Sequence, residues 1–433
     1  MAETAPFNPP SPSMADKPSV AQWIPPPATK EKHNFAELET IDLSKLDGDE
    51  KAQQELVADV KRAIREDGFL FLENYGISLE QLHRQFSIAH YLFNNISEED
   101  KERLLFHPST GRWAGWKHEY GFKRHRQQKD GINQFNWYKE QWENDDLLPA
   151  CVLPFMDEIR AFSEVRFAHS WQRSMLTEAQ YLTNSVNRRL LTLFSRVLEL
   201  PDDWLWNNVQ SHGSPSGEGY FRHALFRPVN EKTLEKSRNI RMHGHTDFGL
   251  TTLLFSVPIS CLQIWGKDDQ WHYAPYRPGA LVINIGETLE IVSGGHFKAT
   301  RHRVFSPPAD QLQEERLSIV QFQSSVGHLR MTPAIESPLI QREGCVEDQG
   351  VYKEFKRVMD LGFPVSDIVW WVAYKIADNV QIPTNQQWRE IQIAEATDPT
   401  DDQRNRIGAD QVLMEGKLMQ QREYMGVKVL LPV

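Results

Sequence analysis

In the first 200 residues, apolar side chains recur mostly at the three- and four-residue spacing of helices. One helix is predicted from the run that contains Leu56, Val60 and Ile64. A second begins at Ser78, which with Gln81 has the sequence of a capping box. A further helical stretch is predicted between residues 155 and 200, ending before a proline.

From Tyr220 to Phe322 the pattern changes to short strands separated by turn signals. Such strands after a mainly helical half predict a mainly β fold with flanking helices, namely a distorted double-stranded β-helix (jelly-roll) core. The predicted regions are a disordered, proline-rich lead-in (1–37), an N-terminal region of helices and strands (38–200), the jelly-roll core (201–330) and a C-terminal helical extension (331–433).

Composition narrows the class of protein. The net charge of −11 argues against nucleic acid as a partner, because no basic excess neutralises phosphates. Three widely separated cysteines favour a reducing compartment, so we expect a cytoplasmic protein. No apolar run is long enough to span a bilayer, and no signal peptide is expected.

The segment around His245 and Asp247 carries the candidate chemistry. Residues i and i+2 of a strand point to the same face, so an imidazole and a carboxylate are aimed at one point. His302, on a later predicted strand, supplies a third ligand type. Two histidines and one carboxylate make the facial triad of non-haem Fe(II) enzymes, which leaves positions open for substrate and O2. We interpret His243 as a pocket residue and not as a fourth ligand.

Ordered motifs around this triad resemble the isopenicillin N synthase-like family of Fe(II)/2-oxoglutarate-dependent dioxygenases. The matching elements are His245-Thr246-Asp247, Leu262-Gln263-Ile264 with Trp271, Asn284-Ile285-Gly286-Glu287, Ser293-Gly294-Gly295, His302-Arg303-Val304 and Arg316-Leu317-Ser318. In the N-terminal half, residues 38–43 resemble the opening strand of the family. Residues 68–77 resemble its Gly-Phe-Phe motif, with Tyr75 in place of the usual histidine.

The resemblance implies an enzyme that binds Fe(II), 2-oxoglutarate and O2, with ascorbate as a reductant. It also implies that Arg316 and Ser318 anchor the distal carboxylate of 2-oxoglutarate, a role suited to a guanidinium fork beside a hydroxyl. A small-molecule substrate of secondary metabolism would be hydroxylated, desaturated or cyclised, with release of succinate and CO2.

The chain departs from the family at one cosubstrate position, where Phe226 replaces a tyrosine. Nearby, the substrate candidates are Phe226 itself and the basic residues Arg222, Arg241 and His243, which with His223 and Arg227 form a basic cluster on two predicted strands. An arginine facing inward would favour an anionic substrate; the alternative is pairing with acidic residues at the rim. An aromatic set, equally suited to a pocket wall or to the core, consists of Trp113, Trp116, Phe135, Trp137 and Tyr138.

Three other interpretations remain open from the residues alone. An iron oxidase of the same fold would not consume 2-oxoglutarate. A zinc-dependent metallo-hydrolase would use the His243-to-Asp247 motif, although Phe248 stands where that motif needs histidine. A non-enzymatic binding module would have lost its metal. In the extension, residues 365–377 predict an amphipathic helix that packs on the barrel or in a homodimer, with a lid as the functional alternative.

Overall fold

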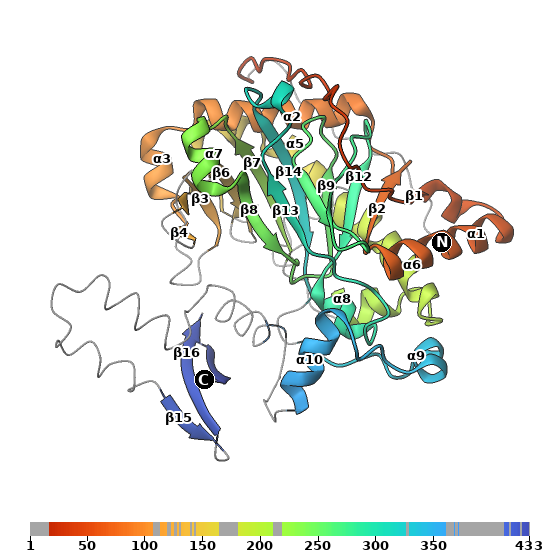
Figure 1. Ribbon diagram of the computed structural model, residues 1–433. Coiled ribbons are helices and arrows are strands. Elements are labelled where there is room, and N and C mark those ends of the chain that lie inside the picture. Colours follow the sequence, from red (N-terminus) through yellow and green to blue (C-terminus); the bar gives the residue numbers. More distant parts are fainter. Residues whose placement is uncertain are drawn as a thin grey trace, which may run out of the picture.

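Two β-sheets face each other in the body of the protein, and helices pack against the larger one (Figure 1). The computed structural model describes residues 17–106, 113–118, 123–124, 128–129, 131–138, 141–142, 144–163, 181–210, 219–325, 329–360, 368, 371, 411–414, 417–424 and 427–432. The larger sheet has eight strands in the order β1 (Thr40–Asp42), β2 (Phe69–Glu73), β12 (Leu281–Ile285), β9 (Thr251–Phe255), β14 (Arg316–Gln323), β7 (Tyr220–Phe226), β6 (Ile132–Trp137) and β3 (Gly115–Lys117). The smaller has four, in the order β11 (Trp271–Tyr273), β10 (Leu262–Trp265), β13 (His302–Phe305) and β8 (Ile240–His245). The predicted jelly-roll is confirmed.

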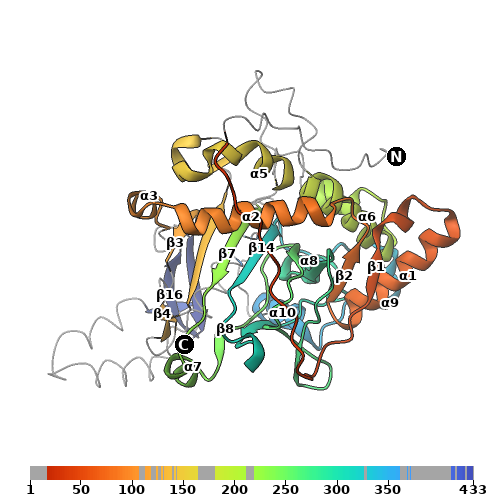
Figure 2. The same cartoon turned by 90° about the horizontal axis from the view of Figure 1, so that it is seen from above.

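The outer face of the larger sheet is covered by four helices, α1 (Glu50–Glu66), α2 (Leu79–Asn95), α5 (Met156–Ser163) and α6 (Arg188–Val197). Figure 2 shows α2 running across the strands of this sheet. The helix predicted after residue 50 is α1, and α2 begins with the predicted capping box, in which the Ser78 hydroxyl accepts from the Gln81 amide. The apolar stripes of these helices and the sheet form one continuous core.

Shorter elements connect these parts. They are α3 (Glu98–Arg103), β4 (Lys123–Arg124), β5 (Gln128–Lys129), α7 (Glu231–Ser237) and α8 (Glu287–Val292), with 3-10 helices at Leu43–Asp47, Asp145–Leu147, Ala150–Phe155 and Ala309–Gln311 and π-helices at Tyr181–Asn187 and Trp206–Gln210. In the described part of the chain, no helix is both long and apolar enough to cross a membrane.

Strand alternation gives the larger sheet two different faces. On β14, Leu317 and Ile319 belong to the core under the helices. Arg316, Ser318 and Val320 alternate with these two residues along β14, so their side chains face the space between the two sheets. The space between the sheets is lined by both polar side chains, such as Arg316 and Ser318, and apolar ones, and the candidate site lies there.

The described part of the lead-in, residues 17–37, is held against the body. Trp23 stacks on Phe86 with ring centroids 4.4 Å apart, and its amide donates to Ser87 Oγ. Further along, Phe35 forms a β-bridge with Tyr273. The composition predicts disorder here, but a partly buried tryptophan and a bridge to β11 hold residues 17–37 against the body, which composition does not reveal.

The C-terminal extension is not wholly helical, as the sequence prediction had it. It begins with α9 (Pro338–Glu343) and α10 (Gly350–Asp360), and α10 packs on α8. Near the end, however, β15 (Gln411–Met414), β16 (Lys417–Tyr424) and β17 (Val427–Pro432) form an antiparallel three-stranded sheet. The sequence between these strands contains Gly416 and Gly426, hairpin signals that the prediction overlooked. Most of the predicted helix 365–377 lies outside the described residues.

Candidate active site

Three candidate metal ligands converge between the sheets. His245 ends β8, His302 begins β13, and the two are paired in the ladder. Asp247 follows two residues after His245 and lies between both rings, with its Oδ1 atom 3.6 Å from His245 Nε2 and 3.7 Å from His302 Nε2. One nitrogen or oxygen atom from each of the three residues can be chosen so that all lie within 4.8 Å of one another. The structure thus brings together the three side chains singled out in the sequence.

Hydrogen bonds orient each of these side chains toward the common point. His245 Nδ1 donates to the His243 carbonyl at 2.9 Å, and His302 Nδ1 donates to the Thr300 carbonyl at 3.2 Å. Because a carbonyl only accepts, both Nδ1 atoms carry the proton, and the unprotonated Nε2 atoms are the ones that can bind a metal. His243, expected as a pocket residue, thus contributes through its backbone.

The two oxygen atoms of the Asp247 carboxylate have different neighbours. Its Oδ2 atom accepts from Thr252 Oγ1 at 2.6 Å and from Asn284 Nδ2 at 2.9 Å, which leaves Oδ1 facing the histidines. Burial raises the pKa of Asp247, but His302, His245 and these two hydrogen bonds outweigh burial and hold the pKa below its usual value. The carboxylate is therefore kept ionised, as a metal ligand requires.

Behind the triad, Thr246 points away from the two ligands that flank it. Its hydroxyl donates to Glu287 Oε1, and the other oxygen of this buried carboxylate accepts from Trp371 Nε1 at 2.8 Å. Sequence reasoning missed Thr252 and Trp371. Thr252 carries a weak signal, since it follows the His-Thr-Asp motif on the next strand, and Trp371 carries none.

Arg316 and Ser318 face the interior on β14 and are almost wholly buried. Arg316 Nε and Ser318 Oγ are buried without a hydrogen-bond partner among the described residues. Buried polar atoms without partners are costly, so this pair of donors calls for a ligand with acceptor oxygens. A carboxylate of 2-oxoglutarate is such a ligand, and the donor set of the triad fits Fe(II). The residues present therefore fit both groups.

Phe226 lies beside these donors, opposite Arg316 in the β7–β14 ladder. Its ring centroid is 5.0 Å from the Arg316 guanidinium and 5.8 Å from that of Arg241. The face of an aromatic ring attracts a guanidinium, so Phe226 helps to position Arg316 although it lacks the hydroxyl of the family tyrosine. The adjoining wall is apolar and consists of Ile132, Ala224, Ile259, Cys261, Val304 and Met242.

The basic candidates near the metal separate into different roles. Arg222 faces the interior, where its Nε atom donates to Asn136 Oδ1 at 2.7 Å and an Nη atom donates to the Tyr220 hydroxyl at 3.2 Å. Arg241 instead donates to the carbonyls of Gly131 and Arg227, at 3.3 and 2.9 Å. Arg222 and Arg241, both candidates from the sequence, therefore lie at different ends of the barrel.

Two further members of the basic cluster do not line the interior. Arg227 is paired with Glu315 at 3.1 Å on the rim, as the alternative interpretation predicted. His223 faces the helices and is fully buried between Trp137 and Phe221. Burial lowers the pKa of His223 from 6.5 to about 3, and neither ring nitrogen has a hydrogen-bond partner among the described residues.

The aromatic set is mostly core and not pocket wall. Trp116, Phe135 and Trp137 are buried in the cluster under the helices. Trp113 and Tyr138 are the exceptions, since both are only half-buried. Tyr138 stacks on Tyr220 with centroids 4.5 Å apart, and Tyr220 stacks on Phe322 at the same distance. This short stack reaches the metal region, since Phe322 is paired with Thr252, the residue that holds Asp247.

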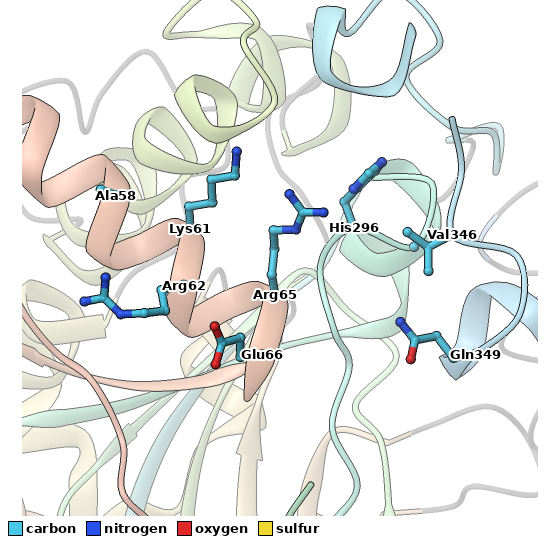
Figure 3. Close-up of a pocket in the computed structure, with 9 residues that line it drawn as sticks. Ala58, Lys61, Arg62, Arg65, Glu66, His296, Val346 and Gln349 are labelled. Atoms are coloured by element: carbon cyan, nitrogen blue, oxygen red, sulfur yellow. The ribbon is translucent and has the colours of Figure 1, made fainter. Parts of the chain in front are cut away.

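A cavity of about 460 Å³ lies between α1, the turn at Gly295–His296 and residues 346–349, and none of the three triad residues lines it (Figure 3). Its arginines are already paired: Arg62 with Glu39 and Asp59, and Arg65 with Glu343. The charges of this groove are therefore largely satisfied within the protein, and we place the chemistry at the triad instead.

Two family models match the chain, and they match its two halves. Residues 220–325 match the 2OG-Fe(II) oxygenase superfamily, and residues 38–153 match the N-terminal region of the non-haem dioxygenase in morphine synthesis. The chain belongs to the 2OG-Fe(II) oxygenase superfamily. It is an Fe(II)- and 2-oxoglutarate-dependent dioxygenase, as the motifs implied. The zinc-hydrolase and binding-module alternatives are thereby set aside.

Relatives of this oxygenase match along most of its length. The 2-oxoglutarate-dependent dioxygenase frbA of Dothideomycetidae sp. (strain 11243) is 26% identical over 315 residues, 69% of this chain and 87% of the relative. Gibberellin 3-beta-dioxygenase 1 of Oryza sativa subsp. japonica is 24% identical, and the match covers 72% of this chain and 73% of the relative. A solved 2OG-Fe(II) oxygenase family protein from Caulobacter crescentus has a TM-score of 0.53 at 17% identity, covering 75% of this chain and 99% of that one. The last likeness shows the shared fold.

Proposed function

We propose that the oxygenase oxidises a small molecule that carries a negatively charged group, and that Arg222 holds this group beside the iron. In this proposal His245, Asp247 and His302 bind Fe(II), and Arg316 with Ser318 binds the distal carboxylate of 2-oxoglutarate. Iron with 2-oxoglutarate supplies the O2 activation that attacks an unactivated C–H bond, while 2-oxoglutarate becomes succinate and CO2. The protein's own residues bind, orient and exclude water.

The observation that carries the proposal is the environment of the Arg222 guanidinium. It is half-buried and contacts an amide oxygen, a hydroxyl and the rings of Tyr220 and Phe322, at 5.2 and 5.0 Å. No carboxylate is paired with it in the part of the chain that the structure describes. A guanidinium withdrawn from water without a counter-ion favours an anionic ligand, which it can bind through two parallel hydrogen bonds.

The position of Arg222 supports a role in binding substrate and not cosubstrate. On β7 it stands opposite Val320, four residues along β14 from Arg316, which is about 13 Å in an extended strand. Its hydrogen-bond partner Tyr220 stacks on Phe322, next to the Thr252 that holds Asp247. Arg222 thus belongs to the metal end of the barrel, and Arg316 to the other.

The unpartnered Arg316 Nε and Ser318 Oγ atoms support consumption of 2-oxoglutarate over the alternative of an iron oxidase without it. A test of this part needs no substrate. The Fe(II)-loaded protein is mixed anaerobically with 2-oxoglutarate, and a weak visible charge-transfer band is expected. If no band forms in a protein that holds iron, the assigned cosubstrate site is wrong.

The substrate class is tested with compounds that the names of related proteins suggest. Gibberellins and auxin, named for two relatives, are carboxylic acids, whereas thymine, bound in a solved Neurospora crassa enzyme, is neutral. Substrate-dependent succinate formation is measured for all three with wild type, Arg222→Gln and the rim control Arg227→Gln.

We expect the acids to stimulate turnover more than thymine. Arg222→Gln should lower kcat/KM for an acid about 10- to 100-fold, because a hydrogen bond to a charged group contributes about 1.5–3 kcal/mol. Arg227→Gln should have no such effect, since Arg227 is paired with Glu315 at the rim. A preference for thymine, or an acid turned over equally well by Arg222→Gln, would refute the proposal.

Two further expectations stand beside this one: a homodimer formed through the C-terminal extension, and a cytoplasmic location. Light scattering on the purified protein and microscopy of a tagged chain measure them directly. A monomer at micromolar concentration would contradict the first, and a tagged chain found in an organelle would contradict the second. The region boundaries at residues 37, 200 and 330 likewise remain predictions, to be tested by limited proteolysis.

A further inference from the structure

We infer that the C-terminal extension supports the metal site. Trp371 increases metal affinity by holding the Glu287 carboxylate in its hydrogen bond with Thr246. Trp371 is a positioning residue in this inference, because it touches neither metal nor substrate. The inference rests on the proposed ligand role of His245, Asp247 and His302. It concerns a segment that follows the matched oxygenase region, which ends at residue 325.

The six-residue helix α8 lies between β12 and the loop to β13. It carries two buried carboxylates, Glu287 and Glu290, which are 0% and 2% exposed. A buried carboxylate is costly unless its oxygens accept hydrogen bonds. Each of the two therefore depends on donors from the segments around it.

The donors to each carboxylate come from two opposite directions. Glu287 accepts from Thr246, between ligands His245 and Asp247, and from Trp371 Nε1 at 2.8 Å. Glu290 accepts from the Ala299 amide at 2.6 Å and from the Tyr352 amide at 2.8 Å. In both cases one donor lies on or near a ligand-bearing segment, since Ala299 is three residues before His302. The other donor belongs to the extension.

The extension is fitted closely to these carboxylates. A side chain at Gly350 would place its Cβ atom 2.2 Å from Glu290 Oε1, and the backbone there has a φ of +67° that favours glycine. Trp371 is fully buried and packs edge-on against Phe355 of α10, with ring centroids 5.6 Å apart. The indole N–H is thus held at one place by α10 while it donates to Glu287.

This arrangement couples the extension to the ligands through Thr246. The strand alternation that turns His245 and Asp247 inward turns Thr246 outward, toward α8. The Glu287 backbone adds a second restraint, because its amide donates to the Asp247 carbonyl at 2.7 Å. If Trp371 no longer donates, the Glu287 carboxylate loses a partner and can turn away from Thr246. Thr246, which lies between ligands His245 and Asp247, is then held less firmly.

The test measures metal binding and not turnover. Apo protein is titrated with Co(II), whose visible absorption reports coordination and whose affinity is read by competition with a chelator. The variants are Trp371→Phe, Thr246→Val and their double mutant. Trp142→Phe is the matched control, because Trp142 is also buried in the core but its Nε1 atom has no hydrogen-bond partner within the part of the chain that the structure describes.

We expect Trp371→Phe and Thr246→Val each to weaken Co(II) affinity about tenfold, the lower end of the effect of losing a hydrogen-bond partner behind a metal ligand. The double mutant should be little weaker than either single mutant, because both act through Glu287. Trp142→Phe should bind Co(II) as wild type does. Where Trp371→Phe does not fold, Glu287→Gln takes its place with the same expected loss.

Two results would overturn the inference: wild-type Co(II) affinity in Trp371→Phe, or additive losses in the double mutant. An equal loss in Trp142→Phe would also overturn it, since the effect would then be a general one of core packing. Asp247→Ala separates this failure from that of the proposed function. If Asp247→Ala abolishes binding while Trp371→Phe does not change it, only the role of the extension is wrong; if Asp247→Ala binds normally, the triad itself is misassigned.

Discussion

The strongest test of the cosubstrate end is the substitution Arg316→Lys. It keeps the positive charge on β14 but removes the planar fork, and with it the Nε donor that has no partner within the described residues. It also replaces the flat guanidinium that lies 5.0 Å from the Phe226 ring. Because Arg316 is not a metal ligand, iron content should not change.

The size of the effect follows from these contacts. Loss of one hydrogen bond to a charged carboxylate costs about 1.5–3 kcal/mol. Since 1.4 kcal/mol is a factor of ten, the half-saturating concentration of 2-oxoglutarate should rise about 10- to 100-fold. Ser318→Ala removes one hydrogen bond to the same charged carboxylate, so it should raise the half-saturating concentration of 2-oxoglutarate by a similar factor, about 10- to 100-fold.

The assay is a titration of succinate formation against 2-oxoglutarate at saturating iron, repeated anaerobically with the charge-transfer band as signal. Arg227→Lys is the control, because this arginine is paired with Glu315 at the rim. An unchanged half-saturation in Arg316→Lys would refute the reasoning, and the cosubstrate would then be anchored elsewhere. A loss of iron in the same variant would show instead that the triad had been disturbed.

Other substitutions test the triad and the core. His245→Ala, Asp247→Ala and His302→Ala should each abolish iron-dependent turnover while leaving the fold largely intact, since each removes one of three ligands. Metal analysis and a turnover assay measure the loss, and circular dichroism measures the fold. Near-normal iron content and activity in Asp247→Ala would contradict the assignment of this carboxylate. His223→Phe should reduce the loss of stability in acid. In the unfolded chain this ring is protonated below pH 6.5, but in the folded protein only near pH 3. Between pH 7 and 5 the free energy of unfolding, measured in urea, should therefore fall by about 2 kcal/mol more in wild type than in the variant. Equal losses would mean that the ring is not kept neutral in the folded state.

The triad could be predicted because its geometry is local. Two of its ligands are two residues apart at the end of a strand, where alternation alone turns them to one face. The pair proposed to bind the cosubstrate, Arg316 and Ser318, follows the same rule on β14. These positions needed only the strand period, and the family motif then identified which strands meet.

The division of the basic residues could be predicted only in part. Alternation already requires that Arg222 and His223 face opposite sides, but not which one faces the metal. That choice follows from the register of β7 against β14 and from the helices, which bury His223 beside Trp137. Both depend on residues distant in sequence, which no local pattern contains.

Contacts that join distant segments could not be predicted at all. Glu287 and Trp371 are 84 residues apart, and nothing near Trp371 in the sequence indicates a buried carboxylate partner. The packing of Trp23 on Phe86 is of the same kind, because a single tryptophan in a proline-rich segment does not change its composition. Such contacts arise from the shape of the finished core.

The ladder between β7 and β14 has a consequence for how such an enzyme can diverge. Arg316 and Arg222 stand on neighbouring strands but about 13 Å apart along them, and the partners of Arg222, Asn136 and Tyr220, lie at the metal end with it. Effects of mutations at that separation add. Selection for a new substrate could therefore exchange Arg222 and its neighbours while the cosubstrate end stays unchanged, and a laboratory library restricted to the metal end should yield altered specificity without a penalty in 2-oxoglutarate binding.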